Sequence, residues 1–392
     1  MKLRQKAAIA IAAISLASVA GVGPANAASI GGGGASFLAN MMDICAAQYN
    51  RNTQSNTASD IVTYASVGSS SGKSGFTKGT YLFGGSESAY SAGTAPAGLV
   101  YVPLVGGAIA IGYRLDGISP ANATVRLPSE VVAKIFAGQI TKWNDPAIVA
   151  DNNRSITSTV YKKDAQGNAV KDKSGNPVVL RTGTKSVIYT LPNQPIKVIY
   201  RADGSGTSNN FTKWLNGVAP SVWTKPANDA FTTAFPGNIN ASTNIGRIVG
   251  ANASQGVATL AAKTKYSITY AEKNWGDAYG LRAVSVSNAS GNYVYPESGA
   301  VSAFLGDAEQ DANGIVSYAY GTKLAGAYTL GIVSYMLLET EYKDKARGAA
   351  VKQLAEYILS PACAAVDPKL GYVVLSGDYL TKAKALIEKA NK

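Results

Sequence analysis

The stretch Tyr200-Arg201-Ala202-Asp203-Gly204-Ser205-Gly206-Thr207-Ser208 carries most of the information about the fold and the function of this chain. An apolar strand pattern over 196–200 precedes it, and a predicted helix over 208–215 follows it. Gly-Ser-Gly-Thr at a helix start leaves backbone N–H groups unpaired and lets the backbone approach a bound group closely. With the guanidinium of Arg201, these are the donors of a tetrahedral oxyanion site. The alternative is a capped strand–helix turn in which Arg201 pairs with Asp203.

The composition indicates a globular binding protein rather than an enzyme. The chain has 392 residues, of which 46% are hydrophobic and 15% charged, enough for two or three domains with a sizeable core. It contains no histidine, which removes the usual general base, Ser-His-Asp triads and most zinc and haem sites. We therefore expect no catalytic residues, no metal site and no cofactor.

The net charge of +12 comes largely from dispersed lysines. Dispersed positive charge favours an anionic ligand or an anionic cell surface over nucleic acid, whose binding requires a concentrated basic patch.

The N-terminus predicts a cleaved secretory signal over residues 1–27. Three cations lie in the first six residues, an apolar run over 7–22 follows, and Ala25-Asn26-Ala27 is a small-x-small cleavage site. The competing interpretation is a membrane anchor, but the run is short and rich in alanine. No cysteine follows the run as a lipoprotein signal would require, so we expect a periplasmic or secreted protein.

The two cysteines, Cys45 and Cys363, are predicted to form one disulfide. In an exported protein, a single bridge is the usual use of two cysteines. It would join the predicted first helix, about 38–49, to the last segment of the chain. The alternative is two separate buried thiols.

Strand and helix patterns alternate along the chain, which predicts an α/β architecture. Long apolar strand patterns occupy 101–113 and 328–338, and amphipathic helix patterns occupy 127–136 and 347–359. The helical stripes indicate core packing.

Residues 155–190 differ from the rest of the chain in their sequence pattern, and this pattern predicts an exposed β-hairpin. The segment 163–170 is nearly repeated as 171–178, and each copy contains a Gly-Asn pair typical of a turn. The Asp and Asn residues raise the alternative of a calcium site. Two copies are too few and their ligand spacing is wrong, so a plain surface hairpin is favoured.

Three further segments combine glycine, hydroxyls and a carboxylate near element ends. They are Gly31-Gly32-Gly33-Gly34-Ala35-Ser36-Phe37, Val67-Gly68-Ser69-Ser70-Ser71-Gly72-Lys73-Ser74 and Phe83-Gly84-Gly85-Ser86-Glu87-Ser88. The second is not a nucleotide-binding P-loop, because three residues rather than four separate Gly68 from Gly72-Lys73-Ser74.

Together with Arg201–Ser208, 136–146, 267–271 and 359–373, these segments resemble the PstS-type phosphate-binding proteins of bacterial phosphate ABC transporters. The resemblance covers nearly the whole mature chain. It implies a two-lobed, type II periplasmic-binding fold with the ligand in a cleft between the lobes. The implied domains are 28–106 and 327–392 for lobe I, and 107–326, with a hairpin insertion at about 155–190, for lobe II.

The resemblance also implies a phosphate site made of hydroxyls, backbone N–H groups and one arginine. Asp203 would orient Arg201, and Glu87 stands where the family usually has Asp, the acceptor for a protonated phosphate oxygen. The longer Glu side chain leaves the choice between phosphate and another oxyanion open, as does the alternative that Glu87 is a surface carboxylate. The implied ligand residues are Ser36, Phe37, Ser69, Glu87, Arg201, Asp203, Ser205, Gly206 and Thr207.

From these observations we expect an exported receptor that captures inorganic phosphate and presents it to an ABC permease. We expect a monomer with no nucleic-acid partner. The alternatives are a secreted relative that acts as a phosphate scavenger, an adhesin or a phosphatase, and a receptor for another oxyanion.

Overall fold

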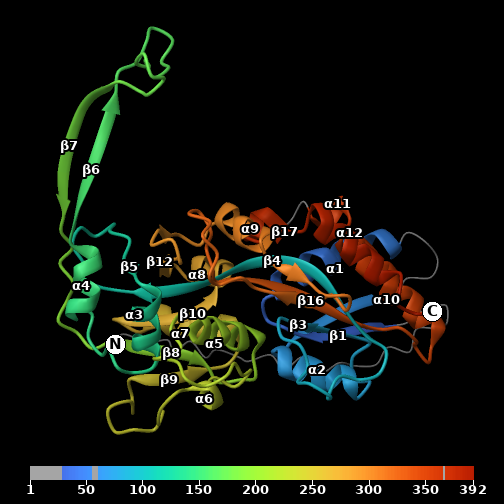
Figure 1. Ribbon diagram of the computed structural model, residues 1–392. Coiled ribbons are helices and arrows are strands. Elements are labelled where there is room, and N and C mark those ends of the chain that lie inside the picture. The colour runs from blue at the N-terminus through green and yellow to red at the C-terminus, as the bar shows by residue number, and fades with distance from the viewer. Residues whose placement is uncertain (1–28, 55–60, 365–366) are drawn as a thin grey trace, which may run out of the picture.

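The computed structural model describes residues 29–54, 61–364 and 367–392, which form two lobes joined along one continuous sheet (Figure 1). The predicted signal over 1–27 lies outside the described residues. Within them, no helix has both the length and the apolar character needed to cross a membrane.

The first lobe is a mixed sheet of strands β2, β1, β3 and β16 with helices packed on both faces (Figure 1). The N-terminal segments and the C-terminal segments of the chain both contribute to it. Its elements are β1 (Ser29–Gly34), α1 (Ala39–Gln54), β2 (Ile61–Ser66), α2 (Ser69–Thr77), β3 (Phe83–Ser86), β16 (Gly331–Glu339), α10 (Lys345–Ile358), α11 (Pro361–Ala364), the 3-10 helix η1 (Asp367–Leu370), β17 (Val373–Val374) and α12 (Gly377–Ile387).

One long strand, β4 (Leu99–Arg114), connects the lobes. It is buried along almost its whole length, because its side chains are nearly all apolar and both faces of the sheet are covered. β4 pairs with β16 as far as Ala108 and with β10 (Ser267–Glu272) from Ile109 onward. This change of partner next to Gly106 and Gly107 supports the predicted lobe boundaries, which remain a prediction.

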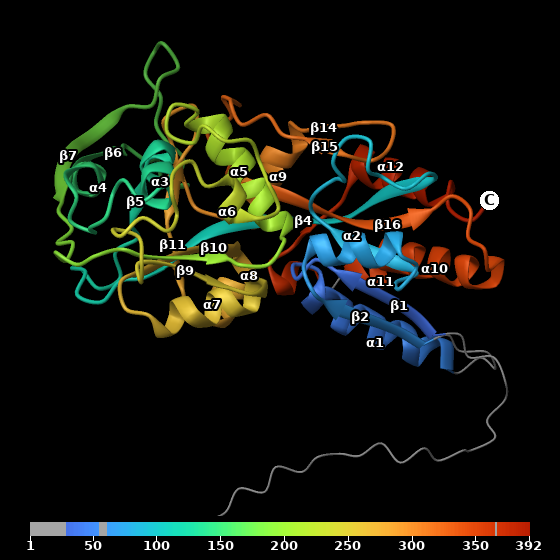
Figure 2. The same cartoon turned by 90° about the horizontal axis from the view of Figure 1, so that it is seen from below.

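The second lobe places β10, β8 and β9 beside the outer half of β4. Helices α7 and α8 cover one face of this sheet, and α3 and α5 lie on the other (Figure 2). Its larger elements are α3 (Ser129–Phe136), α4 (Pro146–Asn152), β8 (Lys197–Arg201), α5 (Gly206–Val218), α6 (Phe231–Ala234), β9 (Ile248–Ala251), α7 (Ala253–Lys263) and α8 (Lys273–Ala278). Short strands complete it: β5 (Arg126–Leu127), β11 (Arg282–Ala283), β12 (Ser285–Ser287) and β13 (Tyr293–Val294). Helix α9 (Ser298–Gly306) and the hairpin β14 (Glu309–Gln310) and β15 (Val316–Ser317) return toward the first lobe, where α9 packs on β4 and β16 and Val316 N–H donates to Tyr335 of β16.

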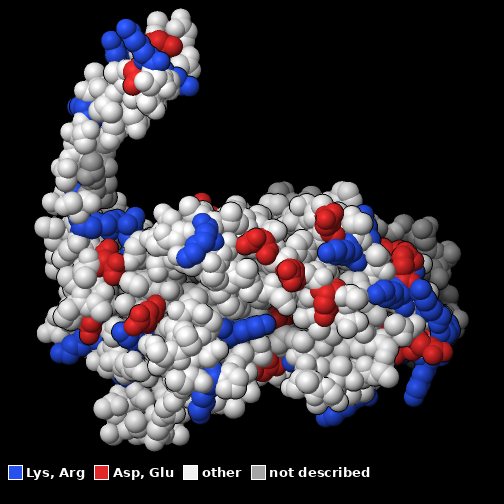
Figure 3. Space-filling model, viewed as in Figure 1, with Lys and Arg blue, Asp and Glu red and all other residues white. Residues whose placement is uncertain are grey.

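A two-stranded arm projects from the second lobe, as the hairpin pattern predicts. Strands β6 (Arg154–Tyr161) and β7 (Val179–Val187) pair only with each other among the described residues. Figure 1 shows the arm standing clear of the body, and Figure 3 shows basic side chains at its outer end.

Most predicted elements are present, with small changes at their ends. The predicted strands correspond to β8, β4 and β16, and the predicted helices correspond to α1, α5 and α10. The helix predicted over 127–136 begins two residues later than expected, at Ser129. Leu127 is instead the last residue of β5, and Pro128 is the cap that starts the helix.

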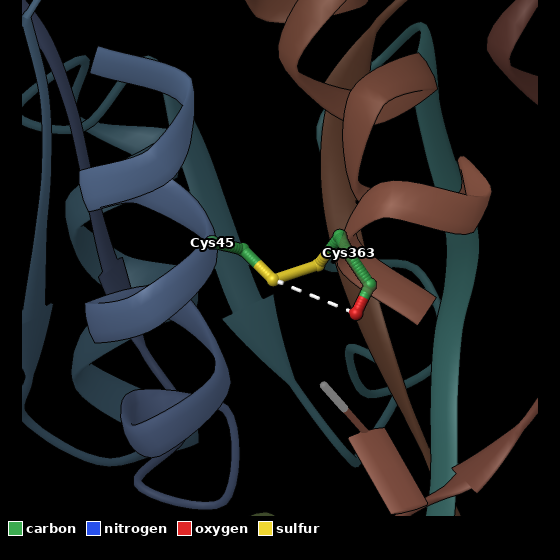
Figure 4. Close-up of a disulfide and its surroundings, with 2 residues drawn as sticks. All are labelled: Cys45 and Cys363. Carbon is green, nitrogen blue, oxygen red and sulfur yellow. Dashed lines mark hydrogen bonds between the residues drawn. A yellow bond between two sulfur atoms is a disulfide. The ribbon is translucent and has the colours of Figure 1, made fainter. Parts of the chain in front are cut away.

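The predicted disulfide is confirmed. Cys45 on α1 and Cys363 on α11 are bonded, with a Cα–Cα distance of 5.5 Å (Figure 4). The bridge joins residues 318 positions apart, so it ties the first helix of the chain to its C-terminal segment.

Candidate functional site

Arg201, the last residue of β8, lies buried between the two lobes with only 1% of its surface exposed. Its Nε donates to Asp203 Oδ1 at 2.8 Å, and its Nη2 donates to Oδ2 at 2.5 Å. Burial alone would lower the pKa of Arg201, but the hydrogen bonds and charge of Asp203 raise it overall. Arg201 is therefore a permanently charged and firmly oriented cation.

The remaining Arg201 nitrogen, Nη1, reaches a group of hydroxyls. It donates to Ser254 Oγ at 2.9 Å and to Thr207 Oγ1 at 3.3 Å. Ser254 Oγ lies 2.8 Å from Ser36 Oγ, which also accepts the backbone N–H of Ser254 at 3.2 Å. Since Ser36 belongs to the first lobe and Ser254 to the second, these contacts connect the lobes across Arg201.

Glu87 follows β3 and is buried, so the interpretation of Glu87 as a surface carboxylate is wrong. Its Oε2 accepts the hydroxyl of Ser69 at 2.8 Å, and its Oε1 accepts the hydroxyl of Ser334 at 2.9 Å. A Cβ added to Gly206 would lie 2.6 Å from Glu87 Oε2 and 2.7 Å from Ser69 Oγ. Only glycine lets the start of α5 approach this carboxylate so closely.

A second buried carboxylate, Glu272, lies in the same cluster and was missed by the sequence analysis. It ends β10, is fully buried, and accepts the hydroxyl of Thr207 at 2.5 Å through Oε1. Its Oε2 has no hydrogen-bond partner among the described residues. The signal available in the sequence was a carboxylate directly after the apolar strand 267–271.

The charge of Glu272 acts on the buried Glu87. Burial first, and the nearby charge of Glu272 second, raise the pKa of Glu87 from 4.5 to about 7. The hydroxyls of Ser69 and Ser334 and the charge of Arg201 act in the opposite direction. At neutral pH, the carboxyl group of Glu87 is therefore protonated in some molecules and ionised in the others.

We predict that Glu87 titrates near pH 7 in the ligand-free protein and that Glu272→Gln lowers this midpoint. Because the folded-state pKa lies above the usual 4.5, the stability that Glu87 contributes is complete below 4.5 and is lost as the pH rises through about 7. Carboxyl-carbon NMR measures the midpoint, and urea unfolding at about pH 5 and about pH 8 measures the stability on either side of it. An unchanged Glu87 midpoint in Glu272→Gln would show that the two carboxylates do not interact.

The structure places Phe37 and Ser205 in supporting roles. The ring of Phe37 packs 4.9 Å from that of Tyr372, and a Cβ on Gly107 would lie 2.3 Å from it. Ser205 caps α5, since its hydroxyl accepts the backbone N–H of Ser208 at 3.3 Å. The contacts of the alternative interpretation, a capped turn with an Arg201–Asp203 pair, are therefore present. They coexist with a buried polar cluster drawn from both lobes.

Helix N-termini surround the cluster. Ser69 and Gly206 are the first residues of α2 and α5, and Ser254 lies in the first turn of α7. The first turn of a helix presents backbone N–H groups without intrahelical partners and carries a partial positive charge. Two residues at these helix starts have a positive φ. Gly68, just before α2, has a φ of 84°, and Ala253, the first residue of α7, has a φ of 59°, which is strained for a residue with a side chain.

The lobes also meet beside the cluster, next to a cavity of about 670 Å³ that Glu87 helps to line. Lys73 Nζ of the first lobe lies 2.9 Å from Asp229 Oδ2 of the second, and Ser70 Oγ donates to the same oxygen at 2.7 Å. The backbone N–H of Ser70 donates to Gly204 O at 3.1 Å. These contacts hold the lobes together around the Arg201 cluster.

Of the nine ligand residues implied by the resemblance, the structure brings eight to the Arg201 cluster by side chain or helix start. The ninth, Phe37, directly follows Ser36 in the chain and packs its ring on Tyr372. The structure adds Ser254, Glu272 and Ser334. Nothing in the described part of the chain gathers three Asp, Glu or Cys side chains as a metal site would need.

The family follows from comparison with known proteins. A family model described as a PBP superfamily domain matches residues 21–362. The chain belongs to the PBP superfamily. Its curated relatives include the phosphate-binding protein PstS of Xylella fastidiosa, 27% identical over 326 residues, which cover 82% of this chain and 74% of the relative. The phosphate-binding protein PstS 2 of Mycobacterium tuberculosis is 30% identical over 294 residues, 73% of this chain and 65% of the relative.

Solved structures confirm the fold of this PBP-superfamily chain. A high-affinity periplasmic phosphate-binding protein with bound phosphate aligns with a TM-score of 0.64 at 21% identity, covering 91% of this chain and 93% of that one. A phosphate-binding protein from Stenotrophomonas maltophilia aligns with a TM-score of 0.63 at 19% identity, covering 92% and 94%. The predicted fold class and the resemblance to PstS-type proteins are thus confirmed. The relatives that these comparisons name are binding proteins rather than enzymes.

Proposed function

We propose that this protein binds inorganic phosphate in the Arg201 cluster. The observation that supports this most strongly is the buried Arg201, oriented by Asp203 and surrounded by hydroxyls from both lobes. Fixed hydroxyl and N–H dipoles can replace the hydration shell of a multivalent anion without gathering many mobile cations in a buried place. The phosphate-binding relatives provide independent support.

The charge balance of the cluster favours an anion that carries a proton. Asp203 already compensates the charge of Arg201, and Glu87 and Glu272 add two further buried carboxylates. An anion without a proton would face these carboxylate oxygens with only lone pairs. Phosphate can place a protonated oxygen against Glu87, whereas sulfate has no proton to donate at neutral pH.

We further propose that the protein is exported, acts as a monomer and delivers phosphate to the permease of an ABC transporter. This extends the PstS-type relationship to the transporter with which such receptors work. No catalytic role is proposed for the cluster, which contains no histidine, the most common general base.

Isothermal titration of the mature protein with phosphate, sulfate, molybdate and a phosphate ester tests the ligand. We expect tight binding of phosphate and weak or absent binding of sulfate. Preference for another oxyanion would contradict the proposal, and hydrolysis of the ester would favour the phosphatase alternative.

We predict that Glu87→Gln shrinks the ratio between the phosphate and sulfate affinities by about tenfold or more, or roughly 1.4 kcal/mol. The amide has nearly the same shape, but it can donate a hydrogen bond to sulfate and removes a charge-assisted hydrogen bond to phosphate. The measurement is titration of both anions at about pH 8, above the pKa of Glu87, where the parent carboxyl is largely ionised.

The matched control is Glu356→Gln, which removes an exposed carboxylate on α10 and should leave both affinities unchanged. If Glu87→Gln also leaves both unchanged, Glu87 does not select the ligand.

The unmodified protein should itself depend on pH. Its rejection of sulfate should weaken as the pH falls below about 7, because protonated Glu87 becomes a hydrogen-bond donor.

A further inference from the structure

The β6–β7 arm, residues 154–187, is the largest feature that phosphate binding leaves unexplained. Its two strands form a sheet of their own, and all the residues of β7 except Val187 are exposed. An isolated two-stranded ladder is marginally stable and has no face on a core. The composition of the arm is therefore not explained by packing within this chain.

The arm carries a concentrated positive charge. It contains seven basic and two acidic residues, which give +5 of the chain's net +12. Figure 3 shows a group of basic side chains at its outer end and further basic side chains nearer the body. The basic residues are Arg154, Lys162, Lys163, Lys171, Lys173, Arg181 and Lys185.

The two acidic residues of the arm bond to its backbone turns rather than to its lysines. Asp164 Oδ1 accepts the backbone N–H groups of Gln166 at 3.0 Å and Asn168 at 2.9 Å. Asp172 Oδ1 accepts two backbone N–H groups in the same way in the following turn. Both carboxylates thus stabilise turns, and among the described residues no ion pair joins either of them to a lysine.

Large apolar side chains are exposed next to these cations. Val160 and Tyr161 end β6, and Val179 and Leu180 begin β7, so all four lie where the ladder meets the turns. Their exposed fractions rise from 37% for Val160 to 63% for Leu180. Tyr161 pairs with Val179 across the ladder, so these two side chains lie side by side on one face, and such a grouping of exposed apolar side chains is typical of a contact with something else.

We propose that the outer end of the arm binds the surface of a lipid bilayer that contains anionic lipids. Lysines near such a surface are attracted by its negative potential, and neighbouring apolar and aromatic side chains enter the boundary between head groups and acyl chains. A soluble polyanion would use the charges but has no place for the apolar side chains. The projecting shape also suits a flat surface, since the tip can reach it while the body stays clear (Figure 1).

Membrane contact through the arm leaves the Arg201 cluster free. The arm leaves the second lobe beside α4 (Figure 1), whereas the Arg201 cluster is held by contacts between residues of both lobes. The inference is therefore independent of the proposed function. The urea unfolding midpoint of each variant checks that it is folded, whether or not phosphate binds.

The test is cosedimentation of the mature protein with vesicles of phosphatidylglycerol and phosphatidylcholine, compared with vesicles of phosphatidylcholine alone. We expect binding only to the anionic vesicles, weakened by salt as charge attraction requires. No binding to the anionic vesicles, or equal binding to both kinds, overturns the proposal.

A charge variant and its matched control locate the binding surface. The arm variant changes Lys162, Lys163, Lys171 and Lys173 to Gln, and the control changes four exposed body lysines, Lys78, Lys225, Lys263 and Lys384, to Gln. Both remove the same net charge. We expect the arm variant to lose about a hundredfold or more in vesicle affinity, since each surface-bound lysine contributes roughly fivefold, and the control to lose little. Equal losses in the two variants would assign the binding to net charge and overturn the role of the arm.

An apolar variant separates a bilayer from a soluble polyanion. Val179→Thr combined with Leu180→Ser keeps every charge and keeps Thr, a good strand former, in the ladder. We expect weaker binding to the anionic vesicles with phosphate affinity unchanged. Vesicle binding equal to that of the parent would show that the arm responds to charge alone, and the lipid proposal would fail.

Discussion

Replacing Cys45 and Cys363 together by alanine is expected to lower the free energy of unfolding by about 5 to 6 kcal/mol. The bridge closes a loop of more than 300 residues, since its ends are 318 positions apart. A cross-link across so long a loop removes much of the conformational freedom of the unfolded chain. Both cysteines are also fully buried, so the alanines lose a little packing in addition.

Guanidinium unfolding of the oxidised parent, the reduced parent and the double alanine variant measures this effect. The reduced parent keeps both sulfur atoms in the core and therefore separates loss of the bridge from loss of packing. Phosphate affinity should change little, because the bridge contacts its own helices and, among the described residues, neither cysteine forms a hydrogen bond with the Arg201 cluster. Two titratable thiols in the denatured, unreduced protein would contradict the bridge itself.

The strand–turn–helix at Arg201 could be predicted because all its determinants are local. The apolar run, the glycines and the cap residue Ser205 lie within a few positions of one another. The arm could be predicted for the same reason, since its turns repeat a local Asp-to-Asn pattern in which the Asp carboxylate holds the turn.

Glu272 and Ser254 could not be placed from the sequence, because their positions depend on how distant segments pair. β10 lies parallel to β8, with Thr269 opposite Ile199, so both strands end at the same edge of the sheet. This register brings Glu272 to the Arg201 cluster. Strand order and register of this kind follow from tertiary packing, and the local pattern around Glu272 gives only a buried strand followed by a carboxylate.

The charge balance of the cluster was unpredictable for the same reason. The sequence offered Arg201, Asp203 and Glu87 as one cation with two carboxylates in separate roles. The structure adds Glu272 at a fully buried position and thereby raises the pKa of Glu87, after burial itself, toward 7. An electrostatic sum over four groups from three separate segments requires their positions in space.

Arg201→Ala is expected to weaken phosphate binding by about 3 kcal/mol or more, which is roughly a hundredfold or greater. The bound anion would lose its only fully buried cation among the described residues and would remain beside Asp203, Glu87 and Glu272. Isothermal titration measures the loss. The matched control is Arg114→Ala, which removes a partly exposed arginine at the end of β4 and should leave the affinity unchanged.

A second variant separates a role of Arg201 in binding from a role in folding. Arg201→Ala alone leaves Asp203 without the partner that, against the effect of burial, holds its pKa below the usual value. Arg201→Ala combined with Asp203→Ala removes both charges and avoids an unpaired carboxylate, so its unfolding midpoint should lie closer to that of the parent. If this double variant is folded and still fails to bind phosphate, Arg201 acts on the anion directly. If it is folded and binds phosphate as the parent does, the anion is held elsewhere, and the cluster between the lobes only stabilises their contact.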